Sequence, residues 1–357
     1  MSDLYVPVLK AKEGEFAALE ALYDSARDKT IPLLEIPDVP FDHASGTPSK
    51  TLDQHISGLP DRIAKAWQTR NFYLDTPYFG GKDHVSEGTC ALDALLSACE
   101  AKATQPIPVI RPDSSEACLS SIQRRPNQTA CIRLSLSDFS EDMDTDAMVD
   151  ELLVRIGRTG PRQIDLMIDL GELPKDQSTA LLVARSILAM TPRKDEWRRV
   201  IFSSSAFPED LSGVSSKSIE KIPRREWLLW VALQKKPSLL PTNLIYSDNT
   251  ISHPTLKGID PRIMRMSAAI RYTSERDWVV VKGSSVGRYG FEQYFDLCKK
   301  LVELPEFAGE DFSWGDRFIA NCARSMAGPG NATTWRKVGV NHHITLVTYQ
   351  LSNSDAI

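Results

Sequence analysis

Six charged residues each end a short apolar segment, and their types could together perform chemistry. They are three cations and three carboxylates: Lys10, Glu35, Asp75, Arg111, Arg133 and Asp169. A carboxylate held between opposite charges can move a proton, and Lys or Arg can hold a phosphate or carboxylate group. The three carboxylates are therefore our candidate catalytic residues, and the three cations are candidate ligand-binding residues.

The spacing of these charges predicts the fold that positions them. Successive members lie 22 to 40 residues apart, and a strand with its returning helix needs about 30 residues. This ladder predicts an α/β protein with a TIM-barrel-like (β/α)8 architecture, in which the strand ends meet at one mouth. The residue two positions before each charge shares its face of the strand. These residues are mostly apolar, so we expect them to fill the barrel beneath a ring of charge.

The register and chemistry of this ring have alternatives. Turning every strand by one residue would bury unpaired charges beneath the helices, at a cost of several kcal/mol each, so the inward register is favoured. Equal numbers of each sign also allow a purely structural network of salt bridges. Three carboxylates could bind Mg²⁺ or Ca²⁺, but the neighbouring cations would repel the ion, so we expect no metal site. The sequence indicates no particular cofactor.

The later part of the chain is harder to place. The eighth barrel strand is either residues 244–246 or residues 278–282, and the latter segment could pair as a hairpin with residues 269–272. We expect a barrel over residues 1–285 and a C-terminal α+β extension over residues 286–357 that packs on it. Residues 344–349 are rich in β-branched side chains and predict a strand.

Five further residues are candidates for ligand binding. Lys282 and Gly283 open a Gly- and Ser-rich segment after an apolar strand, where backbone N–H groups could cradle an anion; a flexible turn is the alternative. Trp335 and Arg336 could stack on a ligand or simply pack. His342 precedes the predicted final strand and could reach the site, although a structural histidine is commoner. Ser313 and Asp316 resemble a helix capping box.

Composition limits the class of protein. Hydrophobic residues make up 42% and charged residues 25% of the chain, and the net charge is −5, so no global basic field favours nucleic acid or an anionic membrane. The six cysteines include no Cys-x-x-Cys pair, which argues against structural zinc and suits a reducing cytoplasm. We see no leader and no run of 18 apolar residues, and expect a cytoplasmic protein without a membrane span.

Several segments together resemble one family across almost the whole chain. They are residues 5–10 with 13–16, 32–36, 197–201 with 205–208, 270–273, Trp278, 312–316 and 335–343. The combination is similar to the phage and bacterial "Beta protein" family, named for a satellite-phage protein encoded beside a host-killing protein. The family has no settled catalytic residues that we could transfer to this chain.

The resemblance implies a role in phage defence or in a toxin–antitoxin system. We therefore expect action through a protein partner encoded nearby and a small anionic ligand, such as a phosphate-containing molecule, at the barrel mouth. One alternative is an enzyme, a hydrolase or lyase, acting on a phosphorylated or nucleotide substrate with Glu35 or Asp169 as general base. Another is a non-catalytic neutralising protein with an inert, salt-bridged barrel top.

Overall fold

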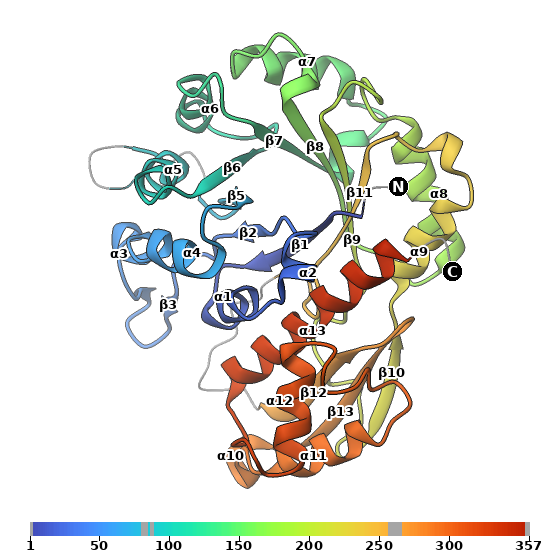
Figure 1. Cartoon of the computed structure of the whole chain (residues 1–357). Coiled ribbons are helices and arrows are strands. Elements are labelled where there is room, and N and C mark those ends of the chain that lie inside the picture. The colour runs from blue at the N-terminus through green and yellow to red at the C-terminus, as the bar shows by residue number, and fades with distance from the viewer. Residues whose placement is uncertain (1–2, 80–84, 86–88, 256–265, 354–357) are drawn as a thin grey trace. The chain divides into compact units, whose positions relative to one another are not determined.

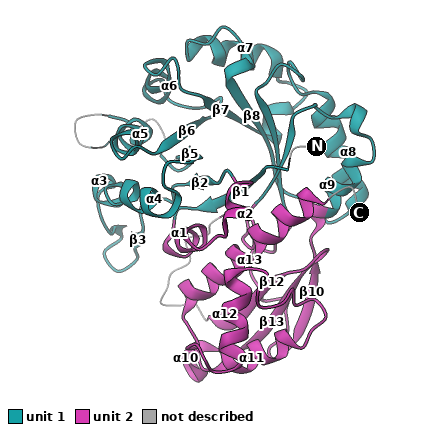
Figure 2. Cartoon of the chain, viewed as in Figure 1, with its two compact units in different colours: residues 1–11, 31–205, 228–248 teal, residues 12–30, 206–227, 249–357 magenta. Residues whose placement is uncertain are grey.

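The computed structural model describes residues 3–79, 85, 89–255 and 266–353. These residues form two compact units, coloured teal and magenta in Figure 2. Unit 1 comprises residues 1–11, 31–205 and 228–248, and unit 2 comprises residues 12–30, 206–227 and 249–357. This division differs from the boundary expected at residue 285, because two earlier segments join the C-terminal part of the chain in unit 2.

Unit 1 is a closed barrel, which confirms the predicted fold class. Among the described residues, eight strands pair in parallel around the ring (Figure 1), in the order β1-β11-β9-β8-β7-β6-β5-β2. The strands are β1 (Tyr5–Lys10), β2 (Leu33–Glu35), β5 (Asn71–Asp75), β6 (Gln105–Ile110), β7 (Ala130–Ser135), β8 (Ile164–Glu172), β9 (Arg199–Ser205) and β11 (Leu244–Asp248).

The barrel interior follows from the alternation of side chains along each strand. Val6 and Val8 of β1 point inward, and so do Ile201 of β9 and Ile245 of β11. The same buried cluster contains Ile31, Leu33, Tyr73, Ile107, Val109, Cys131 and Met167. In the six strands that end in a charge, these residues share a face with that charge, so the apolar pattern fixes the inward register.

Helices follow the strands and lie outside the ring in Figure 1. Thr51, Ser115, Asp144 and Asp176 each accept a backbone N–H at a helix start, which satisfies a donor with no partner inside the helix. The helices are α3 (Leu52–Ile56), α4 (Leu59–Trp67), α5 (Ala91–Ala101), α6 (Glu116–Gln123), α7 (Thr145–Arg155), α8 (Gln177–Ala189) and α9 (Arg225–Gln234). Between β2 and α3 lies a short hairpin of β3 (Phe41–Asp42) and β4 (Thr47–Pro48).

Unit 2 contains an antiparallel sheet and its own core. Strand β13 (Asp277–Ser285) pairs with β10 (Ile219–Pro223) and with β12 (Ser267–Thr273). The barrel's eighth strand is therefore β11, and the alternative candidate forms the expected hairpin instead. The helices of unit 2 are α1 (Glu13–Glu20), α2 (Asp24–Arg27), α10 (Val286–Tyr289), α11 (Gln293–Val302), α12 (Trp314–Ala323) and α13 (Ala332–Ser352).

The predicted strand at residues 344–349 is wrong, because this segment lies inside α13. Ile344, Val347, Thr348 and Leu351 are buried, and this spacing of three and four residues is that of a helix face. The helix begins at Asn331, whose side chain accepts the N–H of Thr334. Packing of this face has overridden the strand preference of the β-branched residues.

Candidate functional site

The structure brings all six predicted charges together at the carboxyl end of the barrel strands. Lys10 pairs with Glu35, and these two residues are also partners in the β1–β2 register. Glu35 is in turn the register partner of Asp75 across β2 and β5. The side chains come from six different strands or strand ends, so only closure of the barrel makes them neighbours.

Arg133 is the centre of this network. Its Nη1 donates to Glu35 Oε1 at 2.7 Å and to Asp75 Oδ2 at 2.6 Å, and its Nη2 donates to Asp169 Oδ2 at 2.5 Å. One guanidinium therefore joins three carboxylates. Burial by itself lowers the pKa of Arg133, but Asp169, Glu35 and Asp75 outweigh it and raise that pKa well above its usual value. Arg133 is thus a permanent cation.

Asp75 is fully buried and held by two arginines. Arg111 donates from Nη1 and Nη2 to its two oxygens, both at 2.6 Å, in the bidentate geometry that guanidinium favours. Burial would raise the pKa of Asp75, but Arg111 and Arg133 together lower it below its ordinary value. Asp75 is therefore ionised at neutral pH and carries no proton to donate as a general acid there.

Two members of the network remain partly accessible. The side chains of Arg111 and Asp169 are 24% and 14% exposed, whereas those of Lys10, Glu35 and Asp75 are 6% exposed or less. Asp169 also accepts the N–H of Gly171 at 3.0 Å through Oδ1. A small molecule at the mouth would meet the edges of one cation and one carboxylate.

Two serines complete the inner face at this end, and sequence reasoning missed them. Ser203 of β9 and Ser247 of β11 lie two positions after the inward-facing Ile201 and Ile245, so they share that face. They are partners in the β9–β11 register, and Ser203 is also the register partner of Asp169. The alternation of side chains along each strand could have predicted both serines, but we applied it only to the strands that end in a charge.

Lys282 and Gly283 do not form the expected loop, because β13 continues through both. Lys282 Nζ donates to the carbonyls of Leu211 and Val214 at 2.6 and 2.7 Å. A Cβ on Gly283 would lie 2.8 Å from Gln293 Oε1, so this glycine allows close packing. The lysine's contacts and the strand conformation are structural and form no anion cradle.

Trp335 and Arg336 also belong to unit 2 and do not join the six charges. The Trp335 ring stacks on Tyr294, with centroids 4.2 Å apart and planes 10° apart. Arg336 donates from Nη1 to Ser252 Oγ at 2.5 Å, and its Nε lies 3.6 Å from Glu15 Oε1. Trp335 is therefore part of a packed core.

His342 is fully buried on α13, in unit 2. Its Nδ1 lies 2.8 Å from Asp316 Oδ2, its Nε2 lies 2.7 Å from the Thr273 carbonyl, and its ring stacks on Tyr272. Burial would raise the pKa of Asp316, but His342 and the hydrogen bonds from Ser313 and Tyr272 lower it. Ser313 also caps α12 as expected. The hydrogen-bonded group around His342 therefore has a structural role.

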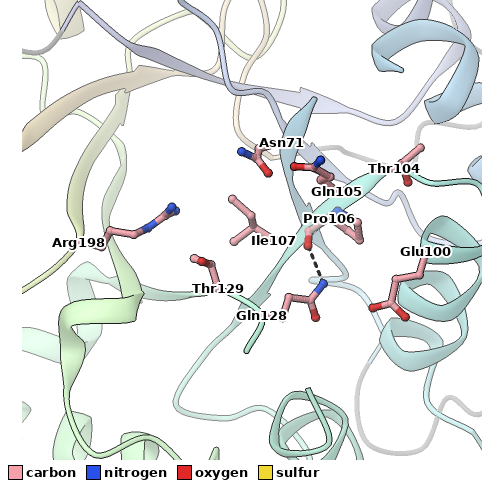
Figure 3. Close-up of a pocket in the computed structure, with 9 residues that line it drawn as sticks. All are labelled: Asn71, Glu100, Thr104, Gln105, Pro106, Ile107, Gln128, Thr129 and Arg198. Carbon is pink, nitrogen blue, oxygen red and sulfur yellow. Dashed lines mark hydrogen bonds between the residues drawn. The ribbon is translucent and has the colours of Figure 1, made fainter. Parts of the chain in front are cut away.

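A pocket of about 270 Å³ lies at the other end of the barrel strands (Figure 3). Gln105 begins β6, Thr129 precedes β7 and Arg198 precedes β9, so the pocket is at their amino ends. Arg198 Nε donates to buried Asp165 at 2.8 Å, and Asp165 accepts the Tyr73 hydroxyl at 2.6 Å. The lining contains none of the six mouth charges and comprises Asn71, Glu100, Thr104, Gln105, Pro106, Ile107, Gln128, Thr129 and Arg198.

Within the described part of the chain, no three His, Cys, Asp or Glu side chains gather as metal ligands. No helix there combines the length and the apolar character needed to span a bilayer.

Comparison with known proteins gives a family. Among curated proteins, none matches the chain significantly. A solved structure, the spore coat polysaccharide biosynthesis protein spsE of Bacillus subtilis, is 12% identical, with a TM-score of 0.33 over 78% of this chain and 84% of that one. The sequence model described as "Beta protein" matches residues 5–349. This match spans nearly the whole chain, which therefore belongs to the Beta protein family.

Proposed function

We propose that this chain is a phage-defence or toxin–antitoxin component that acts through a protein partner and a small anionic ligand at the barrel mouth. The defence role and the partner, expected to be encoded nearby, are supported by membership of the family and by the phage context that this membership implies. The ligand is supported by the mouth network, since charges at this end of a barrel commonly serve function.

One observation carries the ligand proposal. Six side chains from separate strands converge in one network, and the two least buried are a cation and a carboxylate, Arg111 and Asp169. Arg111 uses two of its five N–H groups on Asp75, and the others can bind an anion. Asp169 can accept a hydroxyl of the same ligand. Lys10 and Arg133 supply positive potential behind this edge.

The enzyme alternative reduces to fewer residues. Asp75 is held ionised, and both oxygens of Glu35 are engaged, one by Lys10 and the other by Arg133. Asp169 is then the favoured candidate for a general base, because its side chain is the most exposed of the three carboxylates. The complete pairing of the other charges is the specific observation that favours a non-catalytic, neutralising protein.

Phosphate binding tests the ligand part of the proposal. We expect inorganic phosphate to bind the purified chain, and Arg111→Gln to weaken binding roughly ten- to hundredfold, because a charge-assisted hydrogen bond contributes about 1.5–3 kcal/mol. The control is Arg193→Gln, a more exposed arginine that pairs with Asp150. Isothermal titration calorimetry would contradict the proposal if phosphate did not bind or if both variants bound it equally.

Phage plaque counts on cells that express the chain with its neighbouring gene test the biological part. Asp169→Asn should abolish protection or neutralisation while the protein remains folded. Asp150→Asn, at an exposed helix position, should leave it intact. Full activity of Asp169→Asn would favour the inert, salt-bridged alternative.

A further inference from the structure

The ring of residues at the barrel mouth has a charged arc and a neutral arc. Strands β1, β2, β5, β6, β7 and β8 supply the six charges. Strands β9 and β11 complete the closed ring and supply Ser203 and Ser247, which follow Asp169 in register, and Ser247 lies beside Val6 of β1, deeper than Lys10. Ion pairs hold the side chains of the charged arc, whereas the neutral arc contains fully buried hydroxyls that no described residue satisfies.

Both serine hydroxyls are buried, and neither has a hydrogen-bond partner in the part of the chain that the structure describes. Ser203 and Ser247 are each 0% exposed, and both Oγ atoms lack a partner. Buried hydroxyls in native proteins nearly always have one. Two such groups side by side in register, on the inner face, form a place where a bound molecule would supply the missing contacts.

Their chemistry differs from that of the rest of the mouth. A serine hydroxyl both donates and accepts, which suits another hydroxyl. Asp169, the register partner of Ser203, ends the charged arc and can accept from a hydroxyl as well. From Arg111 to Ser247 the inner face therefore changes from anion-binding to hydroxyl-binding groups.

We propose that Ser203 and Ser247 form a hydroxyl-binding subsite, so that the ligand of the mouth is a polyhydroxylated anion of the sugar-phosphate class. The inference rests on the proposed function, in which Arg111 holds the anionic group. The hydroxyl-bearing body of the ligand lies against the two serines and Asp169 Oδ1, which accepts one N–H from Gly171 and can accept a second donor.

Calorimetry with two probes tests this inference on the full chain. Ribose 5-phosphate should bind at least tenfold more tightly than inorganic phosphate, and Ser203→Ala with Ser247→Ala should abolish that difference while leaving phosphate binding unchanged. Ser204→Ala is the matched control, because Ser204 lies on β9 beside Ser203, is also buried and has no hydrogen-bond partner within the described segments. By strand alternation, its side chain faces away from the barrel interior. This variant should preserve the preference.

Thermal unfolding without ligand separates the subsite from a structural role. Removing an unpartnered buried hydroxyl should leave the melting temperature unchanged or raise it, because its desolvation is uncompensated. A lower melting temperature for both inward variants would mean that the hydroxyls are satisfied within the fold, by a buried water for example, and would overturn the inference.

The outcomes distinguish the two proposals. If phosphate binds through Arg111 but ribose 5-phosphate binds no better, the subsite is wrong and the anion site stands. The same conclusion follows if the double alanine variant keeps the preference. If neither probe binds, the anion site fails and the subsite fails with it.

Discussion

Arg133→Met should destabilise unit 1 strongly, because it removes the cation that joins Glu35, Asp75 and Asp169. Removing one partner of a buried ion pair typically costs about 3–5 kcal/mol. Here Glu35 keeps Lys10 and Asp75 keeps Arg111. Asp169 is partly exposed, so it can be hydrated. We therefore expect the variant to lose about 3–4 kcal/mol of unfolding free energy at neutral pH, and not several times the cost of breaking a single buried pair.

The loss of stability in Arg133→Met should depend on pH. In the wild type the pKa of Asp75 is depressed, so its ionised form stabilises the fold above its unfolded pKa, and this contribution is lost as pH falls through the folded pKa. Without Arg133, burial should raise the pKa of Asp75 relative to the wild type. Mild acidification should then narrow the difference in unfolding free energy between the variant and the wild type.

Urea unfolding, followed by tryptophan fluorescence and circular dichroism, is the assay. Arg155→Met is the control, since this arginine pairs with the exposed Glu116 and should contribute less than about 1 kcal/mol. Adding Asp169→Asn to Arg133→Met should restore part of the stability. A loss below about 1 kcal/mol for Arg133→Met, or a difference that widens at lower pH, would refute the reasoning that the network is energetically coupled.

Two further variants probe local chemistry and packing. Contact with Cys90 lowers the pKa of Cys118 to about 6, so the rate of Cys118 alkylation by iodoacetamide should level off above about pH 7. In Cys90→Ala this rate should keep rising towards pH 9. Mass spectrometry of the alkylated peptide measures both profiles, and identical profiles would contradict the prediction. Gly315→Ala should destabilise unit 2 by about 1–3 kcal/mol, since the new Cβ would lie 2.5 Å from the Val338 carbonyl oxygen, whereas Gly213→Ala enters open space and should be neutral in thermal unfolding.

The apolar pattern and the strand-ending charges predicted the barrel well. Alternation fixes which face of a strand is apolar, and a shift of one residue would bury the charges among apolar groups. The positions of Lys10, Glu35 and Asp169 therefore follow from local sequence. The roles assigned to all six charges remain predictions, since geometry alone does not identify a reaction.

The segments after the barrel were less predictable because their contacts are remote in sequence. The run from Ile344 favours a strand by its β-branched composition, yet its spacing also fits one buried helix face, and packing decided between them. The sequence around Lys282 and Gly283 is typical of a loop. The structure places both residues in β13, which pairs with β10 and packs against α11.

By itself, the sequence determined a repeating strand-and-helix pattern with one charge at the end of each of six strands, because side-chain alternation is local. Only the tertiary structure decided that Arg133 would meet three carboxylates at once, and that Ser203 and Ser247 would have no hydrogen-bond partner among the residues that the structure describes. Those relationships cross strands that are far apart along the chain, and they exist because the ring closes.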